Sequence, residues 1–212
     1  MKGTTHLAIG AAIGIASASL NPFTLTNAAI YIAVAGFSAL AADLDGPSML
    51  SSKLDKASRM FQQWTTTAGV ILAVVVGLQY VLNGQLYWKF AAVSVMILLL
   101  GLVVREGVLR NSLVSLVGCG LLYAGFTMQM HWLAGFGLFI AWVPWLKHRG
   151  LSHTVWAILA WAAISTGLER QLGIPGLMNT AVAGYVSHLA ADTLTPKGVK
   201  WLYPLVGRSF KV

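Results

Sequence analysis

The sequence has few charged residues: Asp, Glu, Lys and Arg together make up 9% of its 212 residues, whereas 57% are hydrophobic. A soluble globular domain has about 25% charged residues, so the composition excludes that class and predicts an integral membrane protein. The chain has one cysteine, Cys119. An internal disulfide and a zinc site built from cysteines are therefore excluded, and any metal site must use histidine and carboxylate side chains.

Acidic residues are scarcer than basic ones, with 6 against 14, so the formal net charge is +8. A basic chain can indicate a nucleic-acid partner. In a membrane protein, however, basic residues more often mark cytoplasmic loops and contacts with anionic lipids. We therefore expect membrane lipids as partners and no nucleic acid, and the sequence gives no indication of the oligomeric state.

Apolar runs separated by turn residues predict eight helices, most of them short for a membrane span. A run of about 15 residues covers roughly 22 Å of a hydrocarbon core about 30 Å thick. No linker divides the chain, so we predict an all-α polytopic membrane helix bundle that forms a single domain over residues 1–212. The predicted helices are residues 6–20, 28–42, 66–82, 89–104, 112–127, 131–146, 153–168 and 177–192.

The first apolar run is open to a second interpretation. Lys2 followed by apolar residues to Leu20, with the small residues Ala16-Ser17-Ala18, is also typical of a signal peptide. The run leads directly into another apolar run, which favours a first transmembrane helix. In the signal-peptide interpretation, cleavage near Ala18 would remove His6.

The basic residues are unevenly distributed over the predicted loops. Twelve of the 14 lie on the same side of the membrane as the N-terminus, and only Lys89 and Arg170 lie on the other side. The positive-inside rule then makes the first side the cytoplasm, so both termini are predicted to be cytoplasmic. The twelve are Lys2, Lys53, Lys56, Arg59, Arg105, Arg110, Lys147, Arg149, Lys197, Lys200, Arg208 and Lys211.

Histidine and aspartate residues gather at the ends of predicted helices on this cytoplasmic side. Ionisable groups near the hydrocarbon region are costly and usually functional, and imidazole with carboxylate is the ligand set for zinc and other divalent transition ions. Seven such residues exceed the four ligands of a closed structural zinc site, which favours two ions. The predicted ligands are His6, Asp43, Asp45, His148, His153, His188 and Asp192.

The spacing of these residues is compatible with one site. His188 and Asp192 are four residues apart, so they share one face of a helix. Asp43 and Asp45 would diverge on a regular helix, but Gly46-Pro47 ends the helix there. His148 and His153 need a bend between them, which Gly150 permits.

Two predicted hairpins, residues 6–42 and 153–192, resemble each other and flank the intervening helices at 66–146. Each begins near a histidine and ends in the sequence Leu-Ala-Ala-Asp, with His-to-Asp separations of 37 and 39 residues. This similarity suggests a duplicated unit. The four-residue sequence is simple enough to recur by chance, so the duplication stays a hypothesis.

Other polar residues have ordinary explanations. His131, beside Trp132 on the opposite side, is typical of an interfacial residue. Asp55, Glu106 and Glu169 lie next to basic residues and are expected to be solvated charges. The seven predicted ligands differ from these residues because all of them lie at helix ends on one side of the membrane. Transport sites instead place acids near the middle of the membrane. This placement favours chemistry at the membrane surface.

Several of these motifs resemble the YdjM-type family of bacterial inner-membrane proteins. They are His148-Arg149-Gly150-Leu151-Ser152-His153-Thr154, the run from Gly184 to Pro204, His6, and Asp43-Leu44-Asp45 with Pro47. The resemblance implies a membrane-bound, metal-dependent hydrolase. The chain departs from many relatives in the long block between the Asp-Leu-Asp and His-Arg-Gly-Leu-Ser-His motifs. The His-x-x-x-Asp arrangement is more weakly similar to zinc-dependent phospholipase C and related nucleases, which implies phosphoester chemistry.

We therefore expect a divalent-metal-dependent hydrolase in the inner membrane, with its site facing the cytoplasm and a phosphoester or lipid headgroup as substrate. Zinc is the expected ion, with manganese or another transition ion as the alternative. Asp45 would act as a general base if it is not a ligand, and Arg149, with Lys197, would hold an anionic substrate. The opposing interpretation is a non-enzymatic metal-binding, transport or scaffold protein.

Overall fold

A computed structural model describes residues 1–103 and 106–211. This part of the chain forms eight α-helices and three short 3-10 helices, and its one β contact is an isolated bridge between Val199 and Phe210. Arg105 and the side chain of Glu106, both of which the sequence singled out, lie outside the described residues. Contacts divide the chain into two compact units, Met1–Ser51 with Val114–Val212 (unit 1) and Ser52–Leu113 (unit 2).

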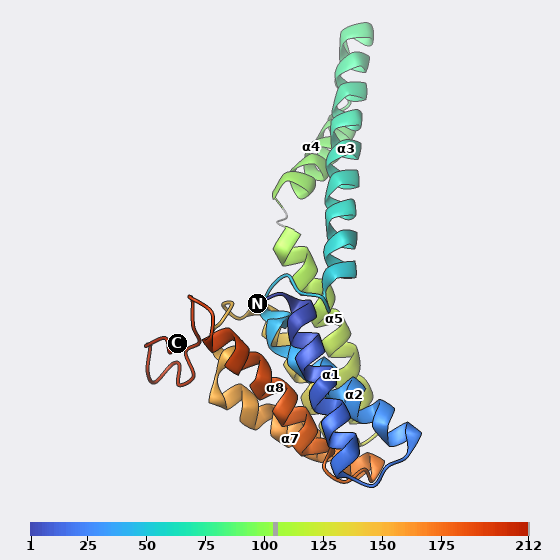
Figure 1. Cartoon of the computed structure of the whole chain (residues 1–212). Helices are drawn as coiled ribbons and strands as arrows, with labels where there is room; N and C mark the ends of the chain where they lie inside the picture. Colours follow the sequence, from blue (N-terminus) through green and yellow to red (C-terminus); the bar gives the residue numbers. More distant parts are fainter. Residues whose placement is uncertain (104–105, 212) are drawn as a thin grey trace. The chain divides into compact units, whose positions relative to one another are not determined.

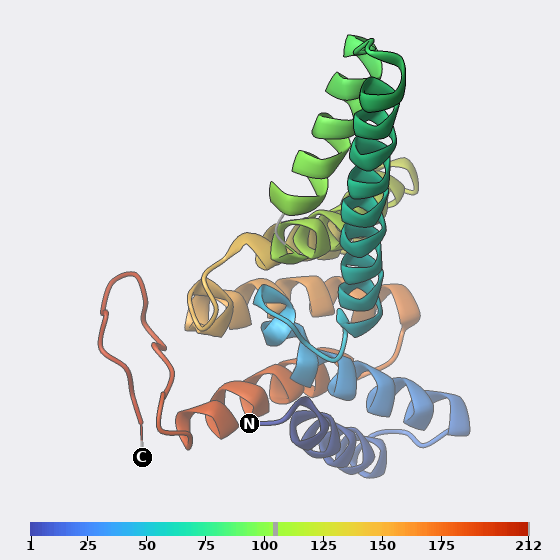
Figure 2. The same ribbon diagram turned by 90° about the horizontal axis from the view of Figure 1, so that it is seen from above.

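Unit 1 is a bundle in which α1, α2, α7 and α8 lie side by side (Figures 1 and 2). Helix α1 packs on α2 and α8, α2 packs on α8, and α7 packs on both α8 and α6. The elements that lie wholly in this unit are α1 (Gly3–Leu20), α2 (Leu25–Ala41), η1 (Ala42–Asp45), α6 (His131–Trp142), η2 (Val143–Trp145), η3 (Leu151–His153), α7 (Val155–Leu172) and α8 (Leu177–Thr193).

Two glycines let α1 and α8 approach the same point on α2. A Cβ atom at Gly10 would lie 2.8 Å from the carbonyl oxygen of Ala35, and one at Gly184 would lie 2.5 Å from the same oxygen. Small residues allow such close backbone contact between membrane helices. His6 precedes Gly10 by four residues and His188 follows Gly184 by four, so each histidine shares a helix face with its glycine. Packing against α2 therefore orients both histidines.

Unit 2 is formed by α3 (Ser52–Asn83), α4 (Trp88–Val103) and the start of α5 (Glu106–Thr127), and Figure 2 shows α3 and α4 as a hairpin. The predicted helix at 66–82 was too short, because α3 continues through the polar stretch that begins at Ser52. Asp55 was wrongly predicted to be solvated. Its carboxylate lies 3.7 Å from Nε of Arg110, and both side chains are mostly buried.

The prediction of an all-helical membrane protein is confirmed. Within the described part of the chain, four helical segments are long and apolar enough to cross a membrane, and a shorter apolar helix covers Trp88–Leu102. The single-domain organisation and the cytoplasmic location of the termini stay predictions. The four long segments are Gly3–Leu20, Leu25–Asp45, Ser52–Asn83 and Gly107–Thr127.

Candidate metal centre

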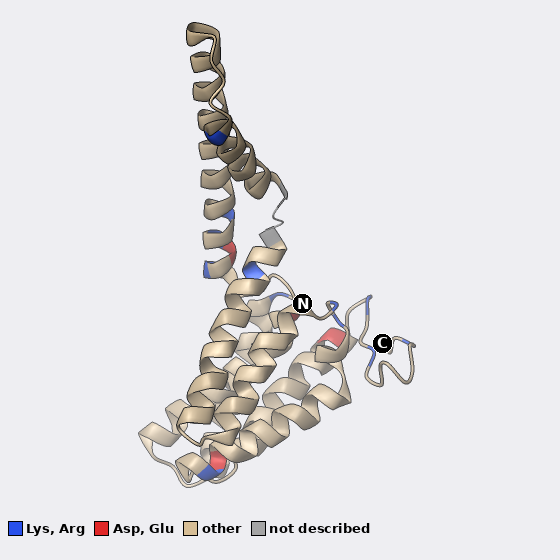
Figure 3. Ribbon diagram, turned by 180° about the vertical axis from the view of Figure 1, so that it is seen from behind, with Lys and Arg blue, Asp and Glu red and all other residues tan. Residues whose placement is uncertain are grey.

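The structure brings all seven predicted ligands together at one end of unit 1. They form three groups, within each of which the ligand atoms lie within 4.8 Å of one another, and Asp43 and His188 each belong to two groups. Figure 3 shows the charged positions of this unit at the ends of its helices, with uncharged sequence between them. The groups are His6, Asp43 and His188; His153, His188 and Asp192; and Asp43, Asp45 and His148.

Four of these side chains lie around the Nε2 atoms of His153 and His188. Nε2 of His153 lies 3.3 Å from Nε2 of His188. Oδ1 of Asp43 is 3.9 Å from the first of these nitrogens and 3.5 Å from the second. Oδ2 of Asp192 is 3.8 and 3.9 Å from them. Ligands at zinc distances of about 2.0–2.1 Å in a tetrahedron are about 3.3–3.4 Å apart. The separations of His188 Nε2 from His153 Nε2 and from Asp43 Oδ1, 3.3 and 3.5 Å, are close to this spacing.

The hydrogen bond of His188 Nδ1 fixes the tautomer of this ring. Nδ1 lies 2.7 Å from the carbonyl oxygen of Ala39, and a carbonyl only accepts, so Nδ1 carries the proton. Nε2 of a neutral ring then has a free lone pair directed at the centre. Metal-binding histidines typically have such a partner on the second nitrogen.

His153 is oriented by Asp45 through Ser152. The Ser152 hydroxyl donates to Oδ2 of Asp45 at 2.5 Å and lies 3.0 Å from Nδ1 of His153, which is itself 3.3 Å from that carboxylate oxygen. Tyr185 fixes this segment by donating its hydroxyl proton to the Ser152 carbonyl at 2.6 Å. Asp45 therefore contacts the outer nitrogen of His153, whereas Asp43 lies near the inner one.

His6 completes the buried part of the cluster. Its ring stacks on His188 with centroids 4.0 Å apart, and its Nε2 lies 3.5 Å from Oδ1 of Asp192. Its Nδ1 is buried and has no hydrogen-bond partner in the described part of the chain. His6 forms a group with Asp43 of its own hairpin, as the duplication hypothesis expects, and this group also contains His188 of the second hairpin.

His148 lies at the open side of the cluster, with 52% of its side chain exposed and Nδ1 2.7 Å from Oδ1 of Asp45. This hydrogen bond raises the pKa of His148 above its ordinary value, against a smaller opposing effect of partial burial. The 2.7 Å separation is that of a hydrogen-bonded pair rather than of two ligands on one ion. The group of Asp43, Asp45 and His148 is therefore less suited to bind a metal ion than the cluster around His153 and His188.

Arg149 links the cluster to the C-terminal segment. Its Nη2 lies 2.8 Å from Oδ2 of Asp192, and its Nη1 donates to Thr195 Oγ1 at 3.1 Å and to the Gly198 carbonyl at 3.0 Å. Its backbone N–H donates to Asp45 Oδ2 at 3.0 Å. The sequence predicted that Gly150 would permit the bend. In the structure the residue with a positive φ is Arg149, at +59°. Its predicted role in holding substrate stays a prediction.

The residues present fit a divalent metal. Imidazole nitrogens of His153 and His188 lie within 3.9 Å of carboxylate oxygens of Asp43 and Asp192, and these are the side-chain types that bind zinc and similar ions. Neighbouring hydrogen bonds hold two of the rings in the required orientation. Asp43, with 21% of its side chain exposed, and the half-exposed His148 provide access from outside.

The remaining sequence expectations fall outside the cluster. His131 is exposed at the start of α6 and belongs to none of the three groups among the described residues. Glu169 was wrongly expected to be a solvated charge, because its carboxylate accepts the backbone N–H of Met178 at 2.7 Å. The supporting roles of Ser152, Tyr185 and the Ala39 carbonyl were missed. Only Ser152 carried a signal, since it lies between the histidines of the motif.

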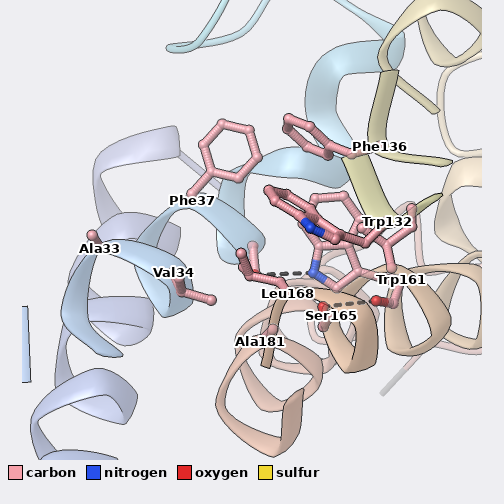
Figure 4. A pocket seen from close by; sticks show the side chains of 11 residues that line it. Ala33, Val34, Phe37, Trp132, Phe136, Trp161, Ser165, Leu168 and Ala181 are labelled. Atoms are coloured by element: carbon pink, nitrogen blue, oxygen red, sulfur yellow. Dashed lines mark hydrogen bonds between the residues drawn. The ribbon is translucent and has the colours of Figure 1, made fainter. Parts of the chain in front are cut away.

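An apolar cavity in unit 1 is a separate feature. It has a volume of about 220 Å³ and lies among α2, α6, α7 and α8, where Phe37, Phe136 and Trp161 face it (Figure 4). The Trp161 indole N–H donates to Ser38 Oγ at 3.0 Å, and the Ser165 hydroxyl donates to the Trp161 carbonyl at 2.7 Å. None of the seven clustered residues lines it.

Comparison with protein families gives one finding. A family model described as YdjM inner membrane protein matches residues 1–212. Neither the curated proteins nor the solved structures give a match.

Proposed function

The chain belongs to the YdjM inner membrane protein family, and on that premise we propose that it is a membrane-bound hydrolase that depends on a divalent metal. The observation that carries this proposal is the cluster around His153 and His188, whose Nε2 atoms lie within 3.9 Å of carboxylate oxygens of Asp43 and Asp192. We propose zinc as the ion, with manganese as the alternative, and a location in the inner membrane with the site toward the cytoplasm.

The position of the cluster supports surface chemistry. Its residues lie at the start of α1, at the end of α2 in η1, before α7 and at the end of α8. A conduction pathway places ionisable residues near the bilayer midplane. A site at the helix ends, with Asp43 and His148 partly exposed, is instead accessible to a substrate at the membrane interface.

A bound divalent ion supplies Lewis acidity and lowers the pKa of a bound water toward about 7. The chain's own residues have complementary tasks. Asp45 holds the His153 ring in its orientation. Asp45 also pairs with the exposed His148, so Asp45 and His148 are placed to accept a proton and pass it on at the open side of the cluster. Arg149 balances the charge of Asp192.

Metal dependence is the direct test. We expect purified protein in detergent to hydrolyse an ester or phosphoester after loading with zinc or manganese, and to lose that activity on chelation. Asp192→Asn keeps the size of the side chain and removes a ligand charge, so kcat should fall by at least about a hundredfold. His131→Ala is the control and should retain activity.

Three results would contradict the proposal, and the first two concern activity and transport. One is hydrolysis that persists without metal or in Asp192→Asn. The other is uptake of metal into vesicles by the reconstituted protein with no turnover of any ester, which would identify a metal carrier. Metal binding with neither turnover nor transport would identify a scaffold.

A further inference from the structure

A second, polar cavity lies directly beside the metal centre. Its volume is about 160 Å³, and no carboxylate is among the described residues that line it. Figure 3 shows basic positions in the loops around the C-terminus, which form part of this cavity. Its polar side chains are those of Lys147, His148, Arg149, Lys197, Lys200 and Tyr203.

Two of the lining residues belong to the metal centre as well. His148 contacts Asp45 at 2.7 Å, and Arg149 contacts Asp192 at 2.8 Å. A group bound in the basic cavity would therefore lie next to residues that line or support the metal shell.

The wall of the cavity is held in place by the C-terminal segment. Arg149 binds the Thr195 hydroxyl and the Gly198 carbonyl. The Val155 N–H donates to the Trp201 carbonyl at 2.9 Å, and Val199 pairs with Phe210. Lys200 lies over the Tyr203 ring with Nζ 5.9 Å from its centroid. A preformed wall lowers the entropy cost of binding an anion.

We propose that this cavity binds the phosphate group of the substrate, so that the enzyme is a phosphoester hydrolase with Lys147, Lys197 and Lys200 as phosphate-binding residues. The assignment rests on the proposed function. Charge-assisted hydrogen bonds from lysine and arginine are the usual means of holding phosphate. The Nε of Arg149, which is buried and has no partner in the described part of the chain, is an additional donor.

The reaction is the hydrolysis of a phosphate monoester. A P–O bond forms to the oxygen of water while the P–O bond to the alcohol breaks. One water proton ends on the alcohol oxygen and the other stays on the released phosphate. The phosphate can belong to a membrane lipid or to a soluble ester, because the cavity recognises the group that both share.

Binding of inorganic phosphate to the full-length protein in detergent tests the cavity without turnover. We expect the triple substitution Lys147→Gln, Lys197→Gln and Lys200→Gln to weaken phosphate binding by at least about tenfold. Lys147 and Lys197 are exposed and Lys200 is half-buried, so the triple variant should fold. Lys89→Gln, an exposed lysine in α4, is the matched control and should bind phosphate like the wild type.

Kinetics then separate the cavity from the metal centre. In the triple variant, KM for a phosphomonoester should rise by at least about tenfold with kcat less affected, whereas Lys89→Gln should leave both unchanged. A short-chain phosphoester in solution and phosphatidic acid in vesicles distinguish the two sources. A preference for either one supports the proposal and names the source.

The possible failures are distinct. Equal phosphate binding by the wild type and the triple variant overturns the phosphate assignment, even if the protein proves to be a metal-dependent hydrolase of other esters. Phosphate binding that depends on the lysines, without metal-dependent hydrolysis of any substrate, overturns the proposed function and, with it, the assignment of a substrate site.

Discussion

Nδ1 of His153 lies 3.3 Å from Oδ2 of Asp45, on the side of the ring that faces away from the metal centre. Nε2 of the same ring faces His188, Asp43 and Asp192. A carboxylate behind a metal-binding histidine sets the tautomer and raises the basicity of the ligand. Asp45 is thus placed to support His153. It also belongs to the group of Asp43, Asp45 and His148, so its role as a ligand or general base stays a prediction.

Asp45→Asn should therefore weaken metal binding without abolishing it. Loss of such a supporting carboxylate typically costs about 10–100-fold in metal affinity, whereas His188→Ala removes a donor from the centre and should cost more. Titration of metal-free protein with zinc measures both. An Asp45→Asn protein that binds no metal at all would instead identify Asp45 as a ligand.

Metal content distinguishes one ion from the two that the sequence predicts. The 2.7 Å hydrogen bond between His148 and Asp45 leads us to expect one tightly bound ion per chain, which His148→Ala retains and His188→Ala loses. Elemental analysis of the purified proteins measures this. Two equivalents in the wild type, falling to one in His148→Ala, would show that the outer group also binds an ion.

The pair formed by His148 and Asp45 should make stability depend on pH. Because the hydrogen bond raises the pKa of His148 in the folded protein, its contribution is fully present below the unfolded value of about 6.5 and is lost as pH rises through the folded pKa. In metal-free protein, His148→Ala should therefore cost more stability at about pH 5.5 than at a pH above the folded pKa of His148. Thermal unfolding in detergent measures the difference, and a cost independent of pH would contradict this explanation.

Close packing of α8 on α2 should be essential to the metal centre. Gly184→Ala would place a Cβ atom 2.5 Å from the Ala35 carbonyl oxygen, and overpacking of this kind typically costs about 1–3 kcal/mol. We expect lower thermal stability and weaker metal binding, because α8 carries His188 and Asp192. Gly77→Ala is the control, since a Cβ atom there meets nothing within 4 Å.

The uneven distribution of basic residues predicts the orientation in the membrane. Reporters inserted at residues 48–51 or fused after the last residue should behave as cytoplasmic, and a reporter in the α7–α8 turn at residues 173–176 should behave as external. Accessibility of the reporters in intact cells measures this. An external C-terminus would place the metal centre on the opposite side from the one proposed.

The sequence by itself determined the class of protein and most of its helices. Scarce charge and long apolar runs leave the membrane as the only compatible environment, and hydrogen bonding within helices satisfies the backbone there. The seven histidines and aspartates were recognisable as a group because ionisable residues are costly in such a sequence. The continuation of α3 back to Ser52 was not predicted, because residues 52–65 are largely polar and lack the continuous apolar signal on which the helix at 66–82 relied.

Only the tertiary structure decided which of the seven form one shell. Separations along the chain do not specify which nitrogen of His153 faces Asp45 and which faces Asp43. Contacts between distant segments decide this. The Ala39 carbonyl orients His188. Ser152, which Tyr185 holds in place, orients His153. Arg149 connects Asp192 to the C-terminal loop. The basic cavity likewise depends on residues 147–150 meeting residues 197–203. Such contacts arise from helix packing around α2, and no local pattern in the sequence encodes them.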